Sequence, residues 1–160
     1  MCVVTYFPNS RGFVFTSNRD ENGLRKTLHP QLYRHQRHTL LYPKDLKKGG
    51  TWFALNKNQK KVACVLNATG QLPQKNKPIS RGQIPLNYLT DDQNFLARNR
   101  LIKTAPFTLI TIDFNNKIQI EEFHWNGKQL SEKRKTRQNL KYGVPTPYTM
   151  RKKTKSDKKV

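Results

Sequence analysis

Hydrophobic residues in the first 127 positions fall in short runs rich in β-branched and aromatic side chains, and turn-forming residues separate these runs. This pattern predicts β-strands joined as hairpins. Three hairpins are predicted, with strands at residues 3–7 and 13–16, 51–55 and 62–66, and 107–114 and 117–125. A tight turn at Asn115 and Asn116 joins the last two strands.

Two stretches between the hairpins have different patterns. Residues 24–48 are basic, include Pro30 and Pro43 and have no sustained period, so we predict a long loop with at most short helices. Apolar residues at helical spacing within 81–103 predict two helices or one broken helix, with Asp91 and Asp92 as caps of the second.

After residue 127 the apolar content falls, and lysine and arginine dominate. Such a composition predicts irregular structure. The sequence is therefore expected to form an α+β domain with a largely antiparallel sheet over residues 1–127, followed by a basic, largely irregular C-terminal tail over residues 128–160.

The charge of the chain is strongly positive. Its 160 residues carry a formal net charge of +21. The segment from Lys128 to Val160 has 12 basic and 2 acidic residues, a net charge of +10. A run of this kind binds polyanions weakly and in a salt-dependent way, although most such runs are simply solvated. Any polyanion partner, nucleic acid included, is therefore expected to bind non-specifically through the tail.

Other compositional features limit the classes of protein and site. No run approaches the roughly 20 apolar residues that cross a bilayer, and the N-terminus lacks the pattern of a signal peptide. We therefore expect a cytoplasmic protein without a transmembrane segment, whose two cysteines stay reduced. The histidines at 29, 35 and 38 lie among arginines with no cysteine near them in the sequence, so no metal site and no cofactor are expected.

Cys2, directly after the initiator methionine, is the most informative position. Removal of Met1 would leave a residue with both a thiol and a free α-amine. The amine has a pKa near 8 in its ordinary state, so its neutral form can take the proton of the adjacent nucleophile. The alternative is that Cys2 is a small structural residue of an edge strand.

Several short motifs occur together in a fixed order. They are Met1-Cys2 at the start of a strand, Ser17-Asn18-Arg19-Asp20-Glu21, Gly49-Gly50-Thr51-Trp52, Leu66-Asn67, Arg81-Gly82, and Ala105-Pro106-Phe107-Thr108-Leu109-Ile110 with Asp113. In this order and spacing the chain resembles the NRDE family, whose animal members are called transport and Golgi organisation proteins. The resemblance extends from Met1 to about Trp125.

The resemblance implies a fold like that of the N-terminal-nucleophile hydrolases, a sandwich of two antiparallel β-sheets between helices. The lysine-rich end stands where the family has further strands, so part of the second sheet is expected to be missing. Carried over by position, Cys2 is the nucleophile, Arg19 the cation beside it, and Asp20 the acceptor that orients the α-amine. A nearby guanidinium favours the thiolate, whereas the carboxylate raises the pKa of the amine.

Four further residues complete the predicted site. Asn67 is the candidate oxyanion donor, because an amide can hydrogen-bond the charge that develops on an attacked carbonyl; an Asn that ends a strand is the alternative. Asn18, Glu21 and Trp52 are candidate ligand-binding residues, although Asn18 and Glu21 are equally suited to bracing the loop and Trp52 to core packing.

Three functions are consistent with the sequence. The first is an N-terminal cysteine hydrolase of amide or acyl bonds, with a small anionic substrate favoured by residues such as Arg19. The second is a non-catalytic binding or trafficking protein for an amphipathic anion such as haem or an acyl conjugate. The third is a basic protein associated with nucleic acid.

Overall fold

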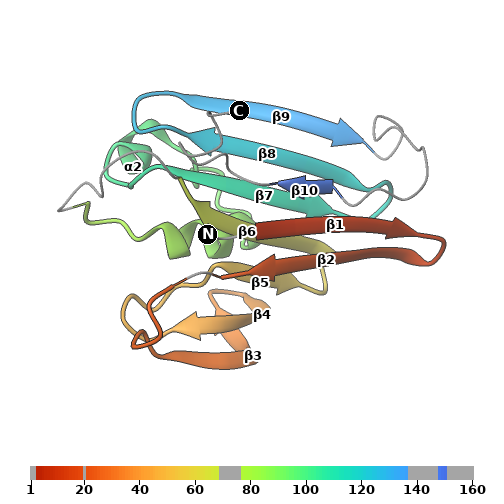
Figure 1. The fold of residues 1–160 in the computed structure, drawn as a ribbon, viewed down its shortest axis with the longest axis horizontal. Coiled ribbons are helices and arrows are strands. Elements are labelled where there is room, and N and C mark those ends of the chain that lie inside the picture. The colour runs from red at the N-terminus through yellow and green to blue at the C-terminus, as the bar shows by residue number, and fades with distance from the viewer. Residues whose placement is uncertain (1–2, 20, 69–76, 137–147, 151–160) are drawn as a thin grey trace, which may run out of the picture.

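The structure is a computed structural model and describes residues 3–19, 21–68, 77–136 and 148–150. These residues form two antiparallel sheets with short helical segments (Figure 1). The elements in chain order are β1 (Val3–Asn9), β2 (Gly12–Asn18), β3 (Thr27–His35), β4 (His38–Asp45), β5 (Phe53–Asn56), β6 (Lys61–Asn67), the 3-10 helix η1 (Arg81–Gln83), α1 (Ile84–Leu89), α2 (Arg98–Leu101), β7 (Phe107–Asp113), β8 (Gln119–Trp125), β9 (Leu130–Thr136) and β10 (Tyr148–Met150).

The larger sheet has seven strands in the order β3-β4-β5-β6-β7-β8-β9, and the smaller has three in the order β10-β1-β2. Each strand of the larger sheet pairs with its neighbour in sequence, and the connection from β6 to β7 contains η1, α1 and α2. Figure 1 shows β1 and β2 lying across the middle of the larger sheet. Within the part of the chain that the structure describes, no helix has the length and apolar character needed to cross a membrane.

Two apolar cores lie on opposite faces of the larger sheet. On one face, Val4 and Tyr6 of the smaller sheet pack with residues of β6, β7 and β8 such as Val62 and Ile112. On the other face, the helical segments contribute residues such as Leu86 to the second core. The central strands β6 and β7 are therefore covered on both faces, which explains why they are nearly continuous apolar runs instead of alternating ones.

The three predicted hairpins are confirmed as β1–β2, β5–β6 and β7–β8. The α+β class with largely antiparallel pairing is confirmed as well. Two helices, α1 and α2, occupy the region predicted for them. The predicted caps are wrong, because α2 begins after Ala97 and has no side-chain cap. Asp91 binds Gln59 and Lys61, and Asp92 binds Arg100.

The long loop predicted before residue 48 is wrong, because β3 and β4 form a hairpin there. The reason is that β3 is an edge strand whose side chains are mostly exposed on both faces. It therefore needs no apolar alternation, and it tolerates Pro30, beside which the register shifts.

Irregular structure was also expected after residue 127, and this is wrong for residues 130–136, which form β9 on the edge of the larger sheet. The three residues of β10 pair with β1. Residues 137–147 and 151–160 lie outside the described part, so the division into a domain and a tail stays a prediction.

A close contact between two glycines joins the start of β5 to the helical layer. A Cβ atom on Gly50 would lie 2.6 Å from the carbonyl carbon of Gly82 and 2.7 Å from its oxygen. The backbone N–H of Thr51 donates to that oxygen at 3.0 Å. Any side chain at residue 50 would therefore push apart two backbone segments.

We expect Gly50→Ala to destabilise the protein by about 1–3 kcal/mol, the usual range for overpacking at a site that cannot expand freely. Urea denaturation would measure the loss. Gly23→Ala is the matched control, because a Cβ there meets no atom within 4 Å. Equal unfolding midpoints for the two variants would contradict the role of this contact.

Candidate functional site

The start of β1 and the end of β2 lie side by side, because Val3 pairs with Asn18 in the antiparallel register. Val3 follows Cys2 in the chain, and Arg19 follows Asn18. Cys2 and Asp20 lie outside the described residues, so their predicted roles stay predictions. The hairpin thus brings the residue after the predicted nucleophile to the strand end that leads into Arg19.

The guanidinium of Arg19 is fixed on two sides. Its Nη2 donates to Oδ2 of Asp45 at 2.8 Å, and its central carbon lies 4.3 Å from the ring centroid of Trp52. Stacking on an indole and charge-assisted hydrogen bonding together hold a long side chain in one position. Its side chain is only 17% exposed, so the pocket receives an oriented charge instead of a freely moving one.

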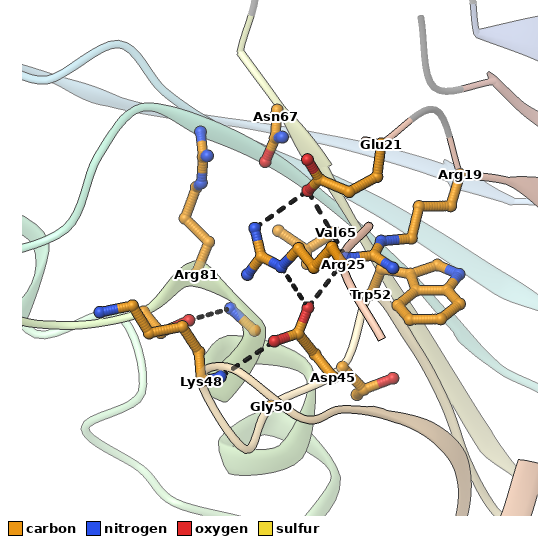
Figure 2. Close-up of a pocket in the computed structure, with 13 residues that line it drawn as sticks. Arg19, Glu21, Arg25, Asp45, Lys48, Gly50, Trp52, Val65, Asn67 and Arg81 are labelled. Carbon is orange, nitrogen blue, oxygen red and sulfur yellow. Dashed lines mark hydrogen bonds and ion pairs between the residues drawn. The ribbon is translucent and has the colours of Figure 1, made fainter. Parts of the chain in front are cut away.

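Asp45, the last residue of β4, is the centre of this cluster. Its Oδ2 also accepts from Nε of Arg25 at 2.6 Å. Its Oδ1 accepts from the backbone N–H groups of Lys47 and Lys48 at 3.1 and 2.9 Å. Glu21 lies beside the pair and accepts from Arg25 at 3.0 Å and from Arg19 at 3.5 Å. Figure 2 shows the two carboxylates on either side of the Arg25 guanidinium.

The pKa of Asp45 is lower than its ordinary value. Burial by itself raises this pKa, but the hydrogen bonds from Arg25 and from the backbone of Lys48, with the charges of Arg25 and Arg19, outweigh burial. Asp45 is therefore ionised at neutral pH and stabilises both guanidinium groups.

Other elements close the pocket opposite this cluster. The carbonyl of Trp52 accepts from the backbone N–H of Val65, which joins the start of β5 to β6. The close approach of Gly50 and Gly82 sets η1 against the same strand, so that Arg81 lines the pocket (Figure 2). Nη1 of Arg81 donates to the carbonyl of Pro106 at 3.1 Å.

The resulting pocket has a volume of about 600 Å³, including the part open to solvent. Its charged lining residues are Arg19, Glu21, Arg25, Asp45, Lys48 and Arg81, four cations and two carboxylates. Both carboxylates bind Arg19 and Arg25. Lys48 and Arg81 add two further positive charges, so the cations of this described lining outnumber its carboxylates and the pocket suits an anion.

Four of the seven predicted site residues line this pocket, namely Arg19, Asn67, Glu21 and Trp52. Asn67 is the exposed last residue of β6 and pairs with Phe107. Asn18 instead belongs to β2 and is not among the lining residues.

The sequence interpretation missed Arg25, Asp45, Lys48 and, as a site residue, Arg81. A signal for one of them was present, because Asp45 is the single acidic residue in the basic segment 24–48. An isolated carboxylate among cations is expected to bind some of them.

The family model described as Transport and Golgi organisation 2 matches residues 1–155 of the chain. No curated protein matches the chain.

We expect Asp45→Asn to destabilise the protein by about 1–3 kcal/mol at pH 7, because two guanidinium groups lose their shared countercharge and one of them is nearly a third exposed. The pKa of Asp45 is depressed in the folded state, so its contribution is fully present above the unfolded value of about 3.9 and is lost as the pH falls through the folded pKa. The difference between wild type and variant should therefore shrink below about pH 4. Urea denaturation at pH 7 and pH 3 would measure it.

The control for this prediction is Glu132→Gln, which removes one negative charge from the exposed strand β9. Exposed ion pairs contribute little, so this variant should differ from wild type by about 0.5 kcal/mol or less. A gap between wild type and Asp45→Asn that stays constant from pH 7 to pH 3 would contradict the assigned ionisation.

Proposed function

Because the chain belongs to the transport and Golgi organisation 2 family, as its resemblance to the NRDE family predicted, we propose that it is an N-terminal cysteine hydrolase of amide or acyl bonds. The proposal includes an N-terminal-nucleophile-like sandwich fold with an incomplete second sheet. Removal of Met1 makes Cys2 the first residue and frees the α-amine that acts as the base.

The observation that carries the proposal is the fixed position of Arg19 at the end of β2, beside the strand that begins at Val3. A guanidinium near a thiol lowers the pKa of that thiol and raises the fraction of reactive thiolate. Asp45 and Trp52 supply the two contacts that hold Arg19 there. A lysine or an unstacked arginine would supply the same charge with less positional precision.

The proposed reaction has two covalent steps. The sulfur of Cys2 forms a bond to the substrate carbonyl carbon, and its proton passes to the α-amine, which Asp20 orients. The amine then gives this proton to the leaving group as the carbonyl carbon–nitrogen or carbonyl carbon–oxygen bond breaks. A water molecule hydrolyses the resulting thioester and restores the thiol. The side-chain amide of Asn67 donates to the oxyanion in both steps.

The charge of the pocket favours an anionic substrate. Lys48 and Arg81 add two positive charges to a lining whose two carboxylates already bind Arg19 and Arg25. A carboxylate or phosphate group of the substrate would therefore bind these two cations, while its reacting carbonyl lies toward Asn67. Glu21 serves mainly to hold Arg25 and Arg19.

A second candidate, non-catalytic binding of an amphipathic anion such as haem or an acyl conjugate, is favoured by one specific observation. A groove of about 790 Å³, including its open part, lies next to the basic pocket. Its walls include Phe15, Pro43 and Phe53, and Trp52 lines both spaces. An anionic head in the basic pocket would place an attached apolar body over Trp52 in this groove.

The hydrolase proposal predicts that the purified protein has lost Met1 and that one thiol reacts rapidly with iodoacetamide at pH 7. Cys64 provides an internal control, because its side chain is fully buried and its Sγ lies 3.3 Å from Oγ of Ser17. Cys2→Ala should abolish the rapid labelling and Cys64→Ala should preserve it. Intact mass spectrometry measures both the processing and the labelling.

The pH profile of labelling tests the role of Arg19. In wild type the midpoint should lie below about 8.5, the ordinary thiol value, and Arg19→Gln should move it upward. Arg134→Gln, on the exposed strand β9, is a control that removes one positive charge elsewhere. Retention of Met1, or equally slow labelling of both cysteines, would overturn the hydrolase proposal.

The second candidate predicts that hemin binds and that Lys48→Gln weakens binding about tenfold, the loss expected for one charge-assisted contact. Titration followed by the change in haem absorbance measures the affinity. Lys57→Gln, in the turn between β5 and β6 and outside the pocket, is the matched control. Equal affinities for both variants, or no binding by wild type, would contradict this candidate.

A further inference from the structure

Exposed apolar side chains are concentrated in one segment of the described chain. The described residues include nine exposed large hydrophobic residues, and five of these lie between residues 24 and 46. All five are leucines, namely Leu24, Leu28, Leu32, Leu41 and Leu46. Single exposed leucines are ordinary, but a group of leucines on one hairpin and its flanks indicates an interaction surface.

Two of these leucines belong to an apolar row that crosses the larger sheet. Leu32 pairs with Leu41, and Leu41 pairs with Leu55. The row continues through Val62, Ile112 and Ile120 on β6, β7 and β8. Residues opposite each other in register point to the same face of a sheet, so one apolar stripe runs from the edge strand β3 to β8.

The smaller sheet covers only part of this stripe. Val62, Ile112 and Ile120 are buried against it, with exposed fractions of 4% or less. Leu41 is 37% exposed and Leu32 is 71% exposed. Figure 1 shows β3 and β4 extending beyond β2, the edge strand of the smaller sheet. The stripe therefore emerges from under its cover at the β3–β4 hairpin.

Basic residues accompany the uncovered leucines. Arg34 is exposed and lies two positions after Leu32 on β3, which puts it on the same face of the sheet. Arg37 is exposed in the turn that joins β3 to β4. Residues 24–48 contain seven basic residues and one acidic residue, a net charge of +6.

We infer that this face of the β3–β4 hairpin, the hairpin surface of Leu32, Leu41, Arg34 and Arg37, docks on an anionic lipid bilayer. The leucine side chains enter the interface between headgroups and acyl chains, and the guanidinium groups bind lipid phosphates. Stable attachment to a bilayer without a spanning helix needs two signals, and apolar side chains beside a polybasic segment supply both.

A second copy of the chain fits this surface less well. Two copies meeting at the hairpin surface would bring like charges together, because the segment has a net charge of +6. Addition of a strand to β3 is also disfavoured, because Pro30 and the shift in register interrupt the edge that a partner strand would need.

An acidic protein is likewise the less favoured occupant. Protein interfaces rely on aromatic anchors seated in pockets, and leucine is under-represented among the residues that dominate their binding energy. The hairpin surface offers leucines as its apolar residues, and it lies outside the basic pocket. The headgroup layer of a bilayer is a broad surface, and its binding requires no pocket on the protein.

The test uses the full chain in a sedimentation assay with vesicles of phosphatidylcholine alone and of phosphatidylcholine mixed with phosphatidylserine. Wild type should bind the anionic vesicles at physiological salt and the neutral ones far more weakly. Leu32→Gln with Leu41→Gln should weaken binding to the anionic vesicles roughly tenfold, because two partly inserted leucines are lost. These substitutions leave the charge unchanged, so they separate the hairpin from the binding expected of the basic tail.

The matched control is Phe7→Gln with Val14→Gln. These two residues are also cross-strand partners, and they are 36% and 50% exposed on the smaller sheet. Their replacement should change vesicle binding less than about twofold, which is less than the loss of one partly buried apolar side chain. Leu32→Gln alone, at the more exposed position, provides a variant whose fold is not at risk and should show an intermediate loss. Arg34→Gln with Arg37→Gln should weaken binding to the anionic vesicles and flatten its salt dependence.

Three results would overturn the inference. Unchanged binding by both leucine variants would assign all vesicle binding to charge alone. A larger effect of the Phe7 and Val14 control would move the docking surface to the smaller sheet. Dimerisation of wild type that the leucine variants abolish, measured by sedimentation velocity without vesicles, would show that a second copy covers these leucines.

Discussion

The carboxylate of Asp45 is the contact on which the geometry of the pocket depends. It joins the residue after β2, a residue two positions before β3 and the turn after β4, because Arg19, Arg25 and the backbone of Lys47 and Lys48 all donate to it. In a chain with a net charge of +21, two guanidinium groups do not come together without such a countercharge. Asp45 therefore makes possible the stacking of Arg19 on Trp52 at 4.3 Å, which fixes one charge in position after the end of β2.

The same arrangement divides the cations of the pocket into two groups. Arg19 and Arg25 share the two carboxylates and so define the shape of the site. Lys48 and Arg81 supply the positive charge by which the cations of the described lining outnumber its carboxylates. Arg81 reaches the pocket because Gly50 and Gly82 allow two backbone segments to touch, a contact that no larger residue at position 50 would permit. The contact between the glycines thus positions one wall of the pocket, and the ion pairs around Asp45 position the other.

The sequence predicts the strands in which burial leaves an uninterrupted pattern of apolar residues, as in Val62 to Leu66 of β6. It does not predict the half-buried strand β4, in which Pro43 and Lys44 interrupt the pattern. It does not predict β3 or β9, since edge strands with exposed side chains are held by backbone pairing that leaves no such pattern. Family resemblance identified Arg19, Glu21, Trp52 and Asn67, which line the pocket. Asp45 was missed because its partner Arg19 lies 26 residues away, and the hairpin that connects them is the element that the pattern conceals.

The β3–β4 hairpin carries both Asp45 of the pocket and the exposed leucines, and its two faces are stabilised differently. Near the core, Leu40 and Tyr42 are buried against the helical layer, and the rings of Tyr33 and Tyr42 lie 4.5 Å apart. On the opposite face, Leu32 remains 71% exposed, so it is nearly as hydrated in the folded chain as in the unfolded one. Folding gains little from such a side chain, and a polar residue would serve the fold as well. The presence of leucine there is therefore explained by a contact outside the fold, and the adjacent arginines indicate the charge of the surface that makes it.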